Sequence, residues 1–130
     1  MYELRNGKKI FVNIPARNLF KPGSADLTKQ AIPVLNKLAK AFAKFTAYQI
    51  NIAGHTDDNP ISTARFPSNW ELSSGRATAV LRFFADKGID PLLMTATGRS
   101  DLFPLYSNST KLGRSKNRRV EFVLEKEKKG

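Results

Sequence analysis

The sequence has no cysteine and a single histidine, His55. Without cysteine, disulfides, thiolate nucleophiles and cysteine-based zinc sites are excluded. One histidine also excludes a histidine-cluster metal site, and it would have to supply every imidazole of a catalytic centre. We therefore expect no metal and no other cofactor. We expect His55 to make a hydrogen bond that supports its loop.

Long apolar stretches are missing as well. No run of about 18 apolar residues occurs, and residues 1–5 lack the apolar core of a signal peptide. If the protein works outside the cytoplasm, we expect an export signal or membrane anchor upstream of the sequence given. No membrane contact is expected from these residues themselves.

Acidic residues are scarce relative to basic ones. The 11 Asp and Glu stand against 22 Lys and Arg, which gives a formal net charge of +11. Such a surplus attracts nucleic acid, anionic lipid or acidic cell-wall polymer, and it does not choose among them. The length of 130 residues, with 41% hydrophobic residues, predicts one globular domain over 1–130. Flexible ends are expected at 1–8 and 126–130.

Hydrophobic periodicity predicts four strands and two helices. Alternating apolar residues indicate strands, and apolar residues three and four apart indicate helices. Ser68 followed by Glu71 is a capping box that predicts where the second helix begins. The expected elements are strands at 10–15, 48–54, 94–97 and 120–124, helices at 27–45 and 69–87, and a long loop at 98–117. The order β-α-β-α-β-β predicts an α/β fold, an α+β sandwich with both helices packed on one mixed sheet.

Two polar side chains are candidates for a binding site. Ligands of such sheets bind at the carboxyl ends of strands, where Asp57 follows the strand at 48–54. Asp57 either shapes its turn by accepting backbone amides or contacts a ligand. Arg76 lies at the border of the apolar stripe of the second helix and needs a partner there. That partner is either Asp57 or Asp58 in an ion pair, or a ligand carboxylate gripped by both guanidinium edges.

The segment 111–119 is the third candidate, with five basic residues in nine and no aromatic residue. It is either a solvated basic loop or a nucleic-acid patch, and the lack of stacking rings disfavours the latter. Arg118 and Arg119 are adjacent at the start of the last strand, so their side chains point to opposite faces and we expect one of them to be functional. Ser73-Ser74-Gly75 lacks the flanking glycines of a nucleophile elbow, and no phosphate-binding loop occurs, so no enzymatic activity is expected.

Three separated blocks resemble the motif set of the OmpA-like peptidoglycan-binding domain. They are Gly54-His55-Thr56-Asp57, then Asn69-x-x-Leu72-Ser73-x-x-Arg76-Ala77-x-x-Val80, then Asn117-Arg118-Arg119-Val120. The resemblance covers nearly the whole chain and implies the OmpA-like fold. Residues 66–73 are most similar to the branch of the flagellar stator protein MotB. The alternatives are the branches of outer-membrane porins and of the peptidoglycan-associated lipoprotein.

The resemblance implies a non-catalytic, periplasmic module that binds the stem peptide of peptidoglycan. By motif, Asp57 and Arg76 would meet the zwitterionic end of meso-diaminopimelate, and Asn69, Thr56 and Arg118 would complete the site. A homodimer is implied, as are the stator partner MotA and the flagellar basal-body ring for the full-length protein. Nucleic acid is not an expected partner. The stator's proton-carrying transmembrane helix has no counterpart in this sequence.

Overall fold

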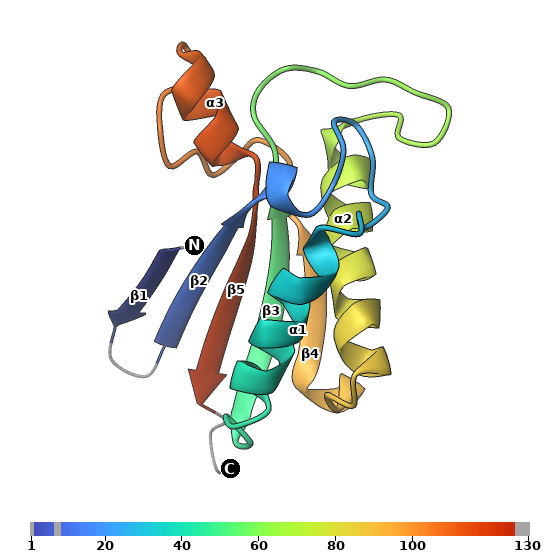
Figure 1. Cartoon of the computed structure of the whole chain (residues 1–130). Helices are drawn as coiled ribbons and strands as arrows, with labels where there is room; N and C mark the ends of the chain where they lie inside the picture. Colours follow the sequence, from blue (N-terminus) through green and yellow to red (C-terminus); the bar gives the residue numbers. More distant parts are fainter. Residues whose placement is uncertain (1, 7–8, 127–130) are drawn as a thin grey trace.

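The strands form one mixed sheet. The computed structural model describes residues 2–6 and 9–126 (Figure 1). The strands are β1 (Tyr2–Asn6), β2 (Lys9–Pro15), β3 (Tyr48–His55), β4 (Met94–Gly98) and β5 (Arg119–Lys126). They lie in the order β1-β2-β5-β3-β4. β3 and β4 are parallel, and the other neighbouring pairs are antiparallel.

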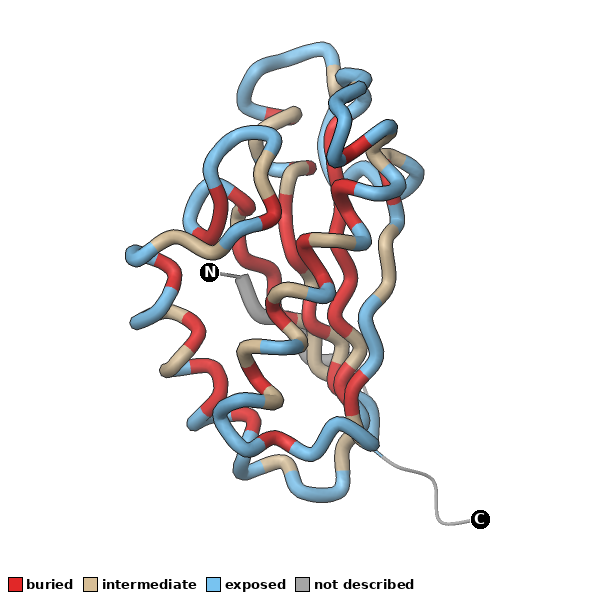
Figure 2. The backbone as a smooth tube through the Cα atoms, turned by 90° about the vertical axis from the view of Figure 1, so that its right-hand side faces the viewer, coloured by how far each residue is buried: buried red, intermediate tan, exposed pale blue. Residues whose placement is uncertain are grey.

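Two helices, α1 (Ala31–Phe42) and α2 (Asn69–Asp86), cover one face of this sheet. Their apolar stripes meet the strands in one core, where the rings of Phe42, Phe84 and Phe122 have centroids 5.5 to 5.7 Å apart. Figure 2 shows the buried positions gathered along the central strands and the inner sides of the helices. The prediction of one mixed sheet with both helices packed on it is confirmed.

The first helix is shorter than the apolar spacing predicts. Helix α1 spans Ala31–Phe42, although the expected helix runs over 27–45. Leu27 instead forms an isolated antiparallel bridge with Phe20, which closes the turn before the helix. Phe45 lies beyond the helix and packs edge-on against Tyr48 at 5.1 Å. Leu27 and Phe45 fit the helical spacing of apolar residues although both lie in the turns that flank the helix. Apolar spacing alone therefore did not locate the ends of the helix.

The expected loop at 98–117 contains a third helix, α3 (Lys111–Asn117). The Thr110 side chain caps it by accepting the Gly113 amide at 2.9 Å. Its one large apolar residue, Leu112, is 67% exposed, so no apolar stripe marked this helix in the sequence. The chain also forms two 3-10 turns, η1 (Ala16–Asn18) and η2 (Pro91–Leu93). No helix in the described part of the chain is long and apolar enough to span a bilayer.

The segments expected to be flexible ends, 1–8 and 126–130, overlap two of the described strands. Residues Tyr2–Asn6 form strand β1, which pairs antiparallel with β2 from Tyr2↔Asn13 to Asn6↔Lys9. Backbone hydrogen bonds to the edge of β2 hold this segment, and they require no apolar pattern. Lys126 is the last residue of β5. The remaining residues of the expected ends, 1, 7–8 and 127–130, lie outside the described residues.

Candidate functional site

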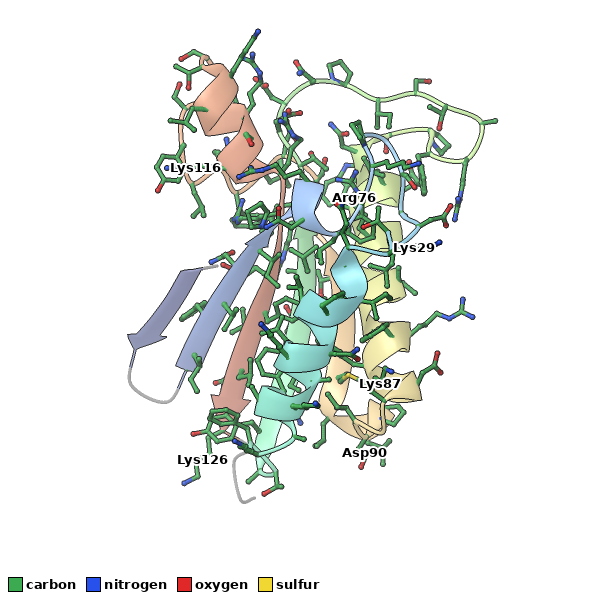
Figure 3. The ribbon with its side chains drawn as sticks, in the orientation of Figure 1. Lys29, Arg76, Lys87, Asp90, Lys116 and Lys126 are labelled. Carbon is green, nitrogen blue, oxygen red and sulfur yellow. The ribbon has the colours of Figure 1, made fainter. Side chains whose placement is uncertain are left out.

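All five residues singled out in the sequence line one cavity of about 380 Å³. The cavity lies where β3 ends, where α2 begins and where the chain turns after η1. Figure 3 shows Arg76 on α2, beside that turn. The five residues come from three separate segments: Thr56, Asp57, Asn69, Arg76 and Arg118. The fold therefore brings together the residues that the sequence predicted.

The close contact of α2 with β3 sets the shape of this region. A Cβ on Gly54 would lie 2.2 Å from the Ser73 carbonyl oxygen, so a side chain here would push α2 away from the strand. The Ser73 hydroxyl accepts the amide of Ser100 at 3.1 Å and donates to the Trp70 carbonyl at 3.1 Å. Gly54 and Ser73 of the motif blocks thus hold the helix against the sheet, and Ser100, which Ser73 contacts, accepts the Thr56 amide with its carbonyl at 2.9 Å beside Asp57.

Arg76 is nearly buried, with 5% of the residue exposed. Its Nε donates to the Ser24 carbonyl at 2.8 Å and its Nη2 to the Lys21 carbonyl at 3.2 Å. The guanidinium lies over the Phe20 ring, 5.0 Å from its centroid. Burial, and next the charge of Arg118, lower the pKa of Arg76 to about 10, so it remains a cation at neutral pH.

The structural partner of Arg76 is therefore a turn of backbone. The ion pair with Asp57 or Asp58, one of the two alternatives from the sequence, does not occur among the ion pairs of the described residues. Two guanidinium nitrogens, Nε and Nη2, donate to carbonyl oxygens, and the Arg76 side chain lines the cavity with its other donor positions still free to serve a ligand. Arg76 thus links the turn at 21–24 to α2 and offers a donor to the pocket.

Asp57 is paired with Arg118. Its side chain is 7% exposed, and Oδ2 accepts from Arg118 Nη1. Oδ1 accepts the Asn59 amide at 3.0 Å. Asp57 therefore shapes its turn, which is one of the two roles expected for it from the sequence. A carboxylate has about four acceptor positions, so two remain for a ligand donor. Asp58 is exposed and does not line the cavity.

Asn69 and Thr56 fix the loop around the cavity. Asn69 Nδ2 donates to the Asn59 carbonyl at 3.0 Å, which ties the start of α2 to the loop after β3. Thr56 is buried, and its hydroxyl donates to the Asp57 carbonyl at 2.8 Å. Each keeps acceptor capacity on its side-chain oxygen.

Sequence reasoning missed Arg17, which also lines the cavity. It lies in η1 and donates from Nη1 to the Ser115 hydroxyl at 2.8 Å, across 98 positions of sequence. The end of β2 pairs with the start of β5, where Pro15 faces Arg119. The available signal was a basic residue two positions after the first predicted strand, but only the pairing of that strand with the last one shows that it lies near the site.

A second cluster lies behind the first, on the other side of β3 and β5. Arg119 is 4% exposed and donates to the carbonyls of Asn117 at 3.1 Å and Phe103 at 3.0 Å. The expectation that Arg118 and Arg119 point to opposite sides is confirmed. Arg119, Glu121 and His55 line a shallow hollow with residues of the loop at 99–105.

The hydrogen bond expected for His55 is absent from the described residues. Neither ring nitrogen has a partner, and the nearest carboxylate oxygen, Glu121 Oε1, is 3.7 Å from Nε2. The ring packs edge-on to Phe103 instead, with centroids 6.3 Å apart. Burial lowers the pKa of His55, so the imidazole is neutral at neutral pH. Within the described residues, no group of three or more acidic or histidine side chains is arranged to hold a metal ion.

Comparisons with known proteins agree on one family. The model of the OmpA family matches residues 19–118. A putative MotB-like protein from Desulfovibrio vulgaris is 41% identical with a TM-score of 0.92, over 96% of this chain and 80% of that one. The cell wall anchor of the T6SS from Pseudomonas aeruginosa is 36% identical with a TM-score of 0.91, over 97% and 87%.

A third solved structure is the periplasmic domain of MotB from Helicobacter pylori. It is 25% identical with a TM-score of 0.90, over 98% of this chain and 90% of that one. The chain spans about half the length of the first curated relatives that it matches, from 44% to 53%.

Proposed function

The chain belongs to the OmpA family, close to the periplasmic domains of MotB, and from this premise we propose that it binds the stem peptide of peptidoglycan in the pocket between Asp57 and Arg76. The family is one of non-catalytic peptidoglycan-binding domains, in agreement with the expectation of no enzymatic activity. The proposal concerns which residues make the site and which part of the polymer enters it.

The pocket has the chemistry that an amino-acid end group requires. An ammonium needs acceptors, which Asp57 and the Thr56 hydroxyl oxygen supply in the lining of the pocket. A carboxylate needs guanidinium donors, and Arg76 and Arg118 both line the pocket. The free end of meso-diaminopimelate carries an ammonium and a carboxylate on one carbon. One end group can therefore bond to the acceptors and to the guanidinium donors of the pocket. Asn69 adds an amide to the lining.

The observation that carries the proposal is the position of Arg76. A nearly buried guanidinium has two nitrogens bonded to carbonyl oxygens, and the same side chain lines a cavity that Asp57 also lines. Such a side chain is oriented before the ligand arrives, so little rotamer entropy is lost on binding. The contacts of Arg76 with the turn at 21–24 do not by themselves require a cavity that is also lined by the carboxylate of Asp57.

The test is sacculus binding by substituted proteins, with melting measured on the same preparations. Asp57→Asn keeps the shape and removes the charge, and Arg76→Lys keeps the charge and removes the planar fork. Each should lower the affinity for purified sacculi on the order of ten- to a hundredfold. Free meso-diaminopimelate should compete with the parent. Arg76→Ala is less useful, because it also leaves the carbonyls of the 21–24 turn without a donor.

Arg82→Gln is the matched control, since Arg82 is exposed on the same helix and does not line the cavity. It should bind sacculi like the parent. Variants at Asp57 and Arg76 that fold and bind as well as the parent would show that the pocket is not the site.

For the full-length protein we propose a wall anchor of the flagellar stator, working in the periplasm as a homodimer with MotA and the basal-body ring as partners. Similarity to MotB domains supports this role, and similarity to a T6SS wall anchor supports the alternative of another envelope machine. Loss of swimming on deletion of the gene, with T6SS function intact, would favour the stator. Sedimentation at rising concentration tests the dimer, and a strict monomer would contradict it for this domain.

A further inference from the structure

The charges that line the pocket do not balance. Three guanidinium groups, those of Arg17, Arg76 and Arg118, face the cavity together with one carboxylate, that of Asp57. The excess is two positive charges. A zwitterionic head has no net charge, so binding it leaves this excess in place. The pocket as a whole is therefore matched to a ligand that carries further negative charge.

The three arginines are not equivalent. Arg118 is paired with Asp57, and Arg76 is placed at the head-group position by its two carbonyl contacts. Arg17 lines the cavity, is exposed to solvent and has no carboxylate partner in the described part of the chain. Arg17 is thus the one of the three guanidinium groups that neither pairs with Asp57 nor is assigned to the head group, and it carries part of the excess positive charge.

Arg17 is also held in position. Its Nη1 donates to the Ser115 hydroxyl at 2.8 Å, which joins η1 to α3. The helix α3 is in turn fixed by the Thr110 cap and by Asn117, whose side chain bonds the backbone of Leu105 and Tyr106. An anchored guanidinium can meet a carboxylate at lower entropic cost than a free surface arginine. Helix α3 therefore contributes to the pocket although it does not line it.

We propose that Arg17 binds a second carboxylate of the same stem peptide, so that the protein selects stems with free carboxylates over stems in which these are amidated. This inference rests on the proposed function of the Asp57–Arg76 pocket. A carboxamide has the size of a carboxylate but carries no charge. Its NH₂ group is a hydrogen-bond donor, as is the guanidinium of Arg17, so the two cannot bond to each other. Amidation of the second group should therefore weaken binding while the head group remains in place.

The experiment measures binding of two synthetic stem tripeptides by titration calorimetry. Both are alanyl-glutamyl-diaminopimelate with an intact zwitterionic head, and in one of them the other carboxylates are amidated. The parent should bind the free tripeptide about three- to tenfold more tightly. Arg17→Gln should bind the amidated peptide like the parent and should lose the preference for the free one. Ser115→Ala, which removes the anchor, should lose part of the preference.

Two further variants separate the possible failures. Arg82→Gln removes one charge from an exposed position outside the pocket and should keep the preference. If Arg17→Gln keeps the parent's preference, or if Arg82→Gln loses it equally, the role of Arg17 is refuted, because general charge attraction then accounts for the selection. If Arg76→Lys binds both peptides as tightly as the parent, or if the parent binds neither, the proposed function itself fails.

Discussion

Arg118 and Arg119 are neighbours of the same residue type with opposite environments. Arg118 has a side chain that is 43% exposed, lines the pocket and pairs with Asp57. Arg119 is 4% exposed, and two of its nitrogens donate hydrogen bonds to the carbonyls of Asn117 and Phe103. The alternation of side chains along a strand separates a residue that can reach a ligand from one that holds a loop.

The same contrast holds at the end of β3. Asp57 keeps spare acceptor positions beside a cavity, whereas His55 is buried with both ring nitrogens unpartnered in the described residues. A pocket whose polar groups are already oriented, with capacity left over, is suited to binding. The buried ring nitrogens of His55 lack hydrogen-bond partners in the described residues and lower stability, and the two guanidinium contacts of Arg119 go to backbone carbonyls, which indicates a structural role for this cluster.

The largest effect that tests this contrast is expected from Arg119→Ala. It leaves two backbone carbonyls and the neighbouring Glu121 without their cation, so the free energy of unfolding should fall by about 2–4 kcal/mol. Chemical denaturation measures this. At a temperature where the variant is folded, sacculus binding should match the parent. If a fully folded Arg119→Ala protein bound sacculi more weakly than the parent, Arg119 would contribute to binding, and the contrast with Arg118 would be wrong.

Arg118→Ala is the matched substitution on the pocket side, and its effect on stability should be smaller. Asp57 loses its ion-pair partner but keeps the Asn59 amide, so we expect a loss of about 1–2 kcal/mol. Sacculus binding should fall about tenfold, because one of the donors to the ligand carboxylate is gone. Stability and binding that respond as in Arg119→Ala would contradict the assignment of Arg118 to the site.

The smallest effect is expected in the pH dependence of stability. Burial lowers the pKa of His55, while the charges of Arg119 and Arg99 also lower it and Glu121 raises it. The unfolded chain then takes up a proton near pH 6.5 that the folded chain does not. Stability should therefore fall as the pH drops below that value, by at most about 1.4 kcal/mol per pH unit.

His55→Phe keeps an aromatic ring against Phe103 and removes the titrating group. The variant should lose this part of the pH dependence between pH 6.5 and the lower pKa of folded His55. Denaturant midpoints across this range, compared with the parent, provide the measurement. Parallel curves for the two proteins would show that folding does not shift the pKa of His55.

Much of the fold was determined by the sequence because its signals are local. The alternation of Ile10, Val12 and Ile14 predicted β2, and the Ser68 cap predicted the start of α2 within one residue. α3 and β1 were missed because neither depends on an apolar stripe. A capped seven-residue helix with an exposed Leu112 and a strand held by backbone pairing leave little trace in hydrophobic periodicity.

The sequence by itself also identified the candidate residues of the site. Asp57 follows the end of a strand, Arg76 borders the apolar stripe of a helix, and Arg118 directly precedes the last strand. Which partner each one takes was decided by the tertiary structure. Arg76 met the carbonyls of a turn more than 50 positions away, and Asp57 met Arg118. Arg17 entered the pocket because β2 ends beside the start of β5 and Ser115 lies within reach. Such pairings depend on distances across the sheet, which residue types and spacing along the chain do not specify.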